Sequence, residues 1–134
     1  MIKDKAQSLN LDNITGGRAV VSGHILSDRA DIFAANERGA NYLYKNNNGN
    51  FEDVAFDYRV DDAIQNGRGT ALSDIYYRGR LDILSGNWLG YHRAWVLEKN
   101  EFKDIGNKDF DKPSRIRTII SADFDNDGFD EVFM

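Results

Sequence analysis

Nine residues at positions 123–131, Asp-Phe-Asp-Asn-Asp-Gly-Phe-Asp-Glu, hold carboxylates at the first, third and fifth positions and a glycine at the sixth. Calcium takes about 6–8 oxygen ligands, and compact loops supply them from positions 1, 3 and 5 and from the carbonyl of position 7, with glycine at position 6 for the sharp turn. In helix–loop–helix sites a glutamate at position 12 precedes a helix. Here the loop runs at once into Glu-Val-Phe-Met at 131–134, which reads as a strand.

The predicted calcium ligands are the carboxylates of Asp123, Asp125 and Asp127, the backbone carbonyl of Phe129 and the side chain of Glu131 at position nine. Asp130 is expected to point elsewhere as a solvated turn carboxylate. The alternative interpretation is a turn between two strands without metal, which Asp, Asn and Gly favour equally. However, three carboxylates at alternate residues repel one another unless a cation neutralises them.

Two weaker copies of this loop lie earlier in the chain, at 74–82 and at 23–31. Their ninth positions, Asp31 and Asp82, and Glu131 of the last copy are 51 and 49 residues apart. A second landmark repeats with them, because Asn-Phe-Glu-Asp-Val at 50–54 matches Glu-Phe-Lys-Asp-Ile at 101–105. A period of about 50 residues fits a four-stranded propeller blade.

Each full unit is predicted to form four short strands separated by turns. The expected strands are 18–22, 31–35, 41–45 and 51–54 in the first unit, and 69–73, 82–85, 94–98 and 102–105 in the second. The Asn- and Gly-rich tip at 46–50 is typical of a β-hairpin, since these residues tolerate positive φ.

The fold class is therefore predicted as all-β, a partial β-propeller of about 2.5 four-stranded blades. The predicted organisation is an N-terminal lead-in (1–16), blade 1 with its connection (17–66), blade 2 with its connection (67–114) and a truncated start of blade 3 (115–134). Because a closed ring needs at least about four blades, remaining blades in cis or other copies of the chain would have to complete it. Of these two interpretations, we favour the first, in which the chain is a fragment of a longer protein.

Composition argues against several classes. The chain has no cysteine, so disulfides and Cys-based zinc sites are absent. Its formal charge of −5 and the lack of a basic stripe argue against nucleic acid as a partner. The N-terminus lacks the apolar segment of a signal peptide, and no apolar run of about 18 residues predicts membrane insertion. The two histidines, His24 and His92, show no pattern of nucleophile and orienting acid, are expected to face solvent, and predict no enzyme and no catalytic residue.

The loop at 123–131, Gly-Arg-Leu-Asp-Ile-Leu-Ser-Gly-Asn at 79–87 and Asn-Tyr-Leu-Tyr-Lys-Asn-Asn-Asn-Gly-Asn-Phe-Glu-Asp-Val at 41–54 together resemble the FG-GAP/VCBS repeat family. Within it they are most similar to the cartilage acidic protein (ASPIC/UnbV-type) branch. The resemblance covers residues 17–134. It implies a β-propeller, usually extracellular or at the cell surface, with calcium between the first two strands of a blade. The family usually has Asp where this chain has Glu131.

The middle loop departs from the family pattern. It keeps Asp74 and Asp82 but carries Tyr76 and Arg78 at the third and fifth positions, where a guanidinium opposes a divalent cation. We expect no metal there, and predict that Arg78 or Arg80 pairs with the two carboxylates as the positive centre of the loop. The first loop has too few carboxylates for a metal.

The resemblance implies a binding or adhesion module that holds a structural Ca²⁺ and recognises a protein or carbohydrate ligand. The alternative is a scaffold or carbohydrate-binding part of a larger carbohydrate-active enzyme or lectin. Trp88, Tyr91 and Trp95 would form a sugar-stacking face in that case. Burial of these aromatic side chains between adjacent blades is the competing interpretation.

Overall fold

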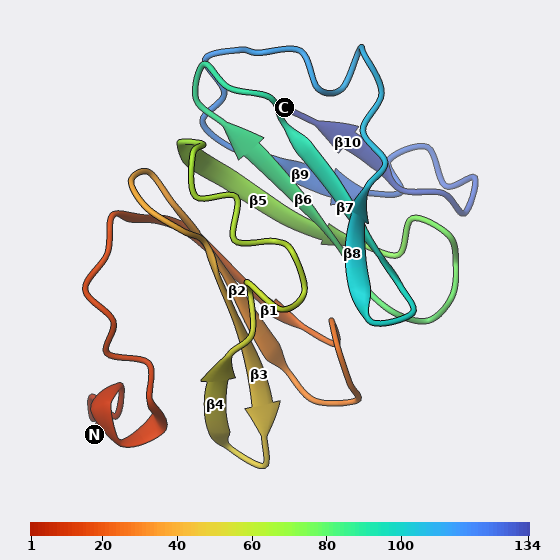
Figure 1. Ribbon diagram of the computed structural model, residues 1–134. Coiled ribbons are helices and arrows are strands. Elements are labelled where there is room, and N and C mark those ends of the chain that lie inside the picture. The colour runs from red at the N-terminus through yellow and green to blue at the C-terminus, as the bar shows by residue number, and fades with distance from the viewer.

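The computed structural model describes residues 1–134 and consists of antiparallel sheets (Figure 1). The first sheet has the order β1-β2-β3-β4 and the second β5-β6-β7-β8, while β9 and β10 form a two-stranded third sheet. The strands are β1 (Gly17–Gly23), β2 (Asp31–Asn36), β3 (Tyr42–Asn47), β4 (Asn50–Asp53), β5 (Gly67–Ser73), β6 (Asp82–Asn87), β7 (Arg93–Glu98), β8 (Glu101–Asp104), β9 (Ile120–Ala122) and β10 (Glu131–Phe133). One short 3-10 helix, η1 (Gln7–Leu9), precedes them. The predicted all-β class and partial propeller are confirmed.

No helix here has the length and apolar character needed to cross a bilayer.

The two four-stranded sheets repeat one another in register as well as in order. Gly17 pairs with Asn36 and Gly67 with Asn87, and each glycine is followed by the same register irregularity. The predicted hairpin between β3 and β4 is formed, and its two tip residues have φ of 57° and 88°, as a two-residue turn with both residues at positive φ requires.

The second sequence landmark repeats because its aspartate has a structural role. Asp53 and Asp104 each accept two backbone N–H bonds of 3.0–3.2 Å, one from the adjacent third strand and one from the residue two positions ahead. The carboxylate thus satisfies backbone donors where the outer hairpin of each blade ends.

The sheets pack face to face, with β1 beside β5 and β5 beside β9, so that the first strand of each unit is innermost (Figure 1). The core of the first junction is apolar, and Trp95 of β7 is 4% exposed and meets Phe33 of β2 edge to face at 5.8 Å between ring centroids. Burial between blades is therefore the correct interpretation for Trp95, and the sugar-stacking face predicted as the alternative is wrong for this residue.

Glycines allow neighbouring sheets to approach at backbone distance. A Cβ on Gly67 would lie 2.9 Å from the Cβ of Ala35 and 3.0 Å from the backbone oxygen of Asn36 in β2, and one on Gly69 would lie 2.6 Å from the Cα of Thr118. Neither position has room for a side chain. The glycines at the start of the second blade are thus explained by packing.

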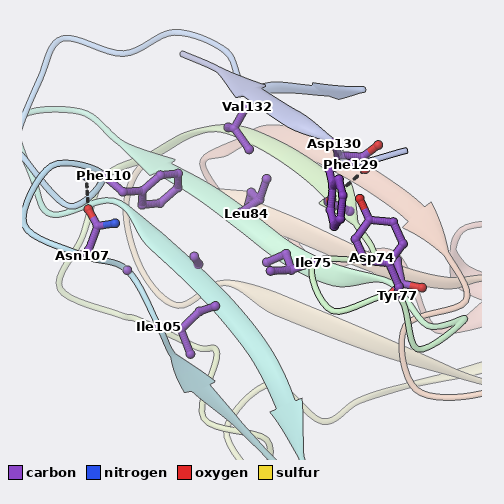
Figure 2. Close-up of a pocket in the computed structure, with 13 residues that line it drawn as sticks. Asp74, Ile75, Tyr77, Leu84, Ile105, Asn107, Phe110, Phe129, Asp130 and Val132 are labelled. Carbon is purple, nitrogen blue, oxygen red and sulfur yellow. Dashed lines mark hydrogen bonds between the residues drawn. The ribbon is translucent and has the colours of Figure 1, made fainter. Parts of the chain in front are cut away.

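The second junction is less filled than the first. Val132 of β10 occupies the place that Ile83 of β6 has in the preceding blade, but the β9–β10 sheet has no third strand to supply a counterpart of Trp95. A cleft of about 250 Å³ lies there, lined in part by Leu84 and Ile105 (Figure 2). The same face of blade 1 is covered by the side chains of blade 2.

Candidate metal centre

The loop at 123–131 joins β9 to β10 and gathers three acidic side chains. Carboxylate oxygens of Asp123, Asp125 and Glu131 lie within 4.8 Å of one another. Calcium binds oxygen at 2.3–2.6 Å, so two ligands on opposite sides of one ion are separated by about 5 Å. The three oxygens therefore fit around a single calcium ion.

The backbone of this loop is curled by its own first carboxylate. The two oxygens of Asp123 accept the N–H groups of Asp127 (3.1 Å) and Gly128 (2.9 Å). Asn126 and Gly128 have φ of 63° and 92°, a conformation that Gly and Asn adopt more readily than other residues. Glu131 closes the loop by accepting the N–H of Phe124 at 2.9 Å.

Two other predicted features of the loop take a different place in the structure. The carboxylate of Asp127 is outside the group of three, and its Oδ1 accepts the N–H of Phe129 at 2.8 Å. Asp130 is exposed, as predicted, but it also accepts a 2.7 Å hydrogen bond from the hydroxyl of Ser73 in β5. This bond ties the third sheet to the second, and its partners are too far apart in sequence for a local pattern to reveal it.

The middle loop has the same curl. Asp74 accepts the N–H groups of Arg78 (2.8 Å) and Gly79 (2.6 Å), and Tyr77 and Gly79 have φ of 53° and 72° at the positions of Asn126 and Gly128. The backbone is thus conserved between the two loops while the side chains of the third and fifth positions differ. What fills the centre of the loop is decided by those side chains.

In the middle loop an arginine fills that centre. The guanidinium of Arg78 donates to Asp82 at 2.8 Å and to the carbonyl of Leu97 at 3.1 Å. Asp82 is fully buried; burial raises the pKa of its carboxyl, and the charge of Arg78 opposes that rise. The predicted arginine–carboxylate pair is confirmed for Arg78 and Asp82, but not for Asp74, which accepts only backbone N–H groups. Arg80 pairs with no carboxylate and donates instead to the carbonyl of Leu97.

In the first loop, the carboxylate at the ninth position is compensated by backbone N–H groups. Asp31 is fully buried, and its two oxygens accept the backbone N–H groups of Leu26 and Asn46, both at 2.8 Å. One buried acidic position is thus compensated by backbone donors in the first blade and by a guanidinium in the second.

The neighbouring loops also touch. The ring of Tyr77 in the middle loop meets the ring of Phe129 edge to face, with centroids 4.9 Å apart (Figure 2). Such aromatic pairs contribute about 0.5–1.5 kcal/mol beyond the area they bury. The conformation of the 123–131 loop is therefore coupled to that of the middle loop.

His92 is a structural residue and does not face solvent, so that prediction is wrong. It is 1% exposed, and its Nδ1 accepts the N–H of Asn87 at 3.0 Å. Nε2 must then carry the proton, which it shares with the hydroxyl of Ser114 at 2.9 Å. In blade 1 the same place is held by Asn41, whose amide oxygen accepts the N–H of Asn36 at 3.0 Å.

The burial of His92 predicts a dependence of stability on pH. Burial lowers the pKa of the imidazole, and the charge of the nearby Asp111 opposes this only in part. A lowered histidine pKa means that the unfolded chain binds the proton first, so stability is full above about pH 6.5 and falls as pH drops towards the lower folded pKa. The fall can reach about 1.4 kcal/mol per pH unit.

His92→Asn, which installs the residue of blade 1, should remove this contribution. Urea unfolding at pH 7.5 and pH 5.5 should show the native chain losing on the order of 1 kcal/mol more than the variant. Parallel profiles for the two proteins would contradict a buried neutral imidazole.

The fold and the loops can be compared with known families. Residues 74–134 match the family model described as an FG-GAP-like repeat, a span that holds both curled loops. This part of the chain is thus similar to an FG-GAP-like repeat, in agreement with the resemblance noted from the sequence.

The relatives make the assignment narrower. Cartilage acidic protein 1 from Xenopus tropicalis is 45% identical over 139 residues, covering 99% of this chain and 22% of its own length. The Mus musculus and Homo sapiens proteins of that name are 46% and 45% identical over 138 residues, covering 98% of this chain and 21% of theirs. The chain is therefore a relative of cartilage acidic protein 1, and it spans about a fifth of the length of these relatives. Neither the family nor the relatives are named for an enzymatic activity.

Proposed function

We propose that this chain is a calcium-binding segment of an FG-GAP-type β-propeller that serves as an extracellular binding or adhesion module. The observation that carries the proposal is the gathering of Asp123, Asp125 and Glu131 in a loop whose backbone matches that of the middle loop. There the same space holds a guanidinium. A cation at the centre of 123–131 would compensate the acidic side chains there, as backbone N–H groups do in the first loop and a guanidinium does in the middle loop.

The ion would be structural. Asp123 follows β9 and Glu131 begins β10, so a calcium bound between them would link the two strands of the third sheet at the loop end. Asp127, whose Oδ1 accepts the N–H of Phe129, and the carbonyl of Phe129 would complete the ligand set. Calcium modules of extracellular proteins bind at about 10⁻⁴–10⁻³ M, which suits a solvent-exposed loop of this kind.

The extracellular assignment rests on the resemblance and accords with relatives that are named for cartilage. The carbohydrate-binding alternative is weakened because Trp95 is in the core. Trp88 keeps part of its surface exposed, and its surroundings are charged.

Calcium titration tests the proposal directly. Isothermal titration should show one saturable site in the native chain, and Asp125→Asn should weaken it by at least about tenfold, because one of the four carboxylate ligands is lost. At a calcium concentration of 100 times Kd, the free energy of unfolding should rise by about 2.7 kcal/mol.

Asp109→Asn is the matched control. Asp109 is an exposed aspartate in a neighbouring turn, and its side chain makes no hydrogen bond or ion pair. Its substitution should leave calcium affinity unchanged. Absence of binding heat and of a stability shift in the native chain, or equal affinity of the native chain and Asp125→Asn, would refute the calcium site.

A further inference from the structure

Three arginines occupy the same position in the three repeat units. Arg18 and Arg68 each follow the first residue of an innermost strand, and Arg117 precedes β9 at the matching place, 49 residues beyond Arg68. They lie at the ends of the innermost strands opposite to the loops at 23–31, 74–82 and 123–131. Since β1, β5 and β9 are side by side, the arginines form a row along one face of the arc.

The gap between the first two arginines contains a carboxylate. Glu37 accepts a 2.6 Å hydrogen bond from Nε of Arg18 and forms a second ion pair with Arg68. These arginines, with the hydrogen bond from Arg18 as the largest cause, hold the pKa of Glu37 below its usual value. The charge of this gap is therefore compensated within the chain.

The gap between the second and third arginines has a tryptophan at the equivalent position. Glu37 donates its N–H to the carbonyl of Gly16 (2.9 Å), and Trp88 donates its N–H to that of Asn66 (2.7 Å), the same bond one blade later. The guanidinium carbons of Arg68 and Arg117 lie 5.3 Å and 4.5 Å from the centroid of the Trp88 ring. Stacking of this kind orients a guanidinium but neutralises no charge.

Both arginines in this gap have N–H groups without an acceptor in the chain. Arg117 is exposed and makes no side-chain hydrogen bond or ion pair, and the buried Nε of Arg68 has no partner. The fork of a guanidinium matches a carboxylate in bidentate geometry, and such bonds are about twice as strong as neutral ones. Trp88 is half-buried and offers the remaining part of its ring as a flat apolar surface beside these donors.

We propose that Arg68, Trp88 and Arg117 form a binding site for a carboxylate on an acidic peptide segment of a partner protein. The ligand carboxylate would supply to this gap what Glu37 supplies to the preceding one. Tryptophan and arginine are also the residues that contribute most to protein interfaces. The proposal rests on the binding role proposed above, but it does not depend on calcium.

An acidic peptide fits better than a polyanion such as a sulfated polysaccharide. Of the three arginines in the row, only Arg117 has no hydrogen-bonded or ion-paired partner within the chain, whereas a polyanion binds through many cations at once. The chain as a whole carries a formal charge of −5, which repels a long anionic polymer outside this one gap. A single carboxylate needs only one or two cations and is repelled less by the net negative charge of the chain.

The test is a nuclear magnetic resonance titration of the 134-residue chain with N-acetyl-aspartate α-amide, which carries one carboxylate, following the two tryptophan indole N–H signals. The Trp88 signal should shift and saturate, whereas the signal of the buried Trp95 should stay in place and report an intact fold. Arg117→Gln should weaken binding by at least about tenfold, the effect of losing one charge-assisted pair. Arg29→Gln removes an exposed arginine from the opposite end of the strands and should leave binding unchanged.

Four outcomes would overturn the proposal. The first is the same shift with the neutral N-acetyl-asparagine α-amide, and the second is an equal loss in Arg29→Gln and Arg117→Gln. The third is tighter binding of a heparin oligosaccharide than of the aspartate probe, and the fourth is the absence of any shift. Because calcium affinity is measured separately on Asp125→Asn, failure here leaves the calcium proposal standing, and failure there leaves this one standing.

Discussion

Replacing Trp95 by alanine should destabilise the protein by about 3–5 kcal/mol, the usual cost of removing a large aromatic side chain from a core. Trp95 is 4% exposed and packs edge to face on Phe33 across the junction of the first two blades. The cavity left behind lies between two sheets that already meet at backbone distance at Gly67, so they cannot close fully over it. Urea unfolding followed by circular dichroism should show the loss as a lower midpoint.

Tyr91→Ala is the control for this prediction. Tyr91 is an aromatic residue in the connection that leads into β7, the strand of Trp95, and it is 57% exposed. Its substitution should change stability by no more than about 0.5 kcal/mol. If both variants behaved alike, Trp95 would not be the anchor of the junction.

Replacing Arg78 by alanine should cost about 2–4 kcal/mol, because Asp82 then remains as a buried charge without its counter-ion. The value lies below the range for a wholly buried pair, since the Arg78 side chain keeps 32% of its surface exposed. The carboxyl pKa of Asp82 is already raised by burial, and loss of the guanidinium should raise it further.

The stability loss caused by Arg78→Ala should depend on pH. An acid whose pKa is raised on folding lowers stability as the pH rises from its unfolded pKa to its folded pKa, and the loss is complete above the folded value. The deficit of Arg78→Ala should therefore shrink as pH falls towards about 4, the pKa of an unfolded aspartate. In a double-mutant cycle, Asp82→Asn should recover part of the loss at pH 7. A deficit that does not change with pH would argue that Arg78 acts by packing alone.

The sequence predicted the strands well because each repeated landmark has a repeated hydrogen-bonding role. Asp53 and Asp104 bind the same backbone donors in their blades, so a match in sequence was also a match in structure. The curl of the loops was predictable for the same reason, since Asp74 and Asp123 accept equivalent N–H groups.

Other features were beyond sequence reasoning because they depend on partners far along the chain or on a repeated position with a changed residue. The bond from Ser73 to Asp130 joins residues on two sheets. His92 gave no sign of burial, because its counterpart in blade 1 is Asn41. Trp88 likewise lies at the position of Glu37 in the previous unit. Comparing the repeats for identical residues does not detect a position at which the residue has changed. The constant spacing of the arginines beside it was the available signal.

The glycines of the innermost strand have a consequence for shape. Successive sheets approach until backbone meets backbone at Gly67 and Gly69, so nothing compressible separates them there. The angle between neighbouring blades then depends on two separations. Near the axis the sheets are separated by backbone contacts, which cannot become shorter, and near the rim by the size of side chains such as Trp95. A methyl group added at the axis would open the wedge from its narrow end and flatten the curvature of the arc. The number of blades that a ring of this kind can accommodate is thus encoded in a few positions where the chain has no side chain.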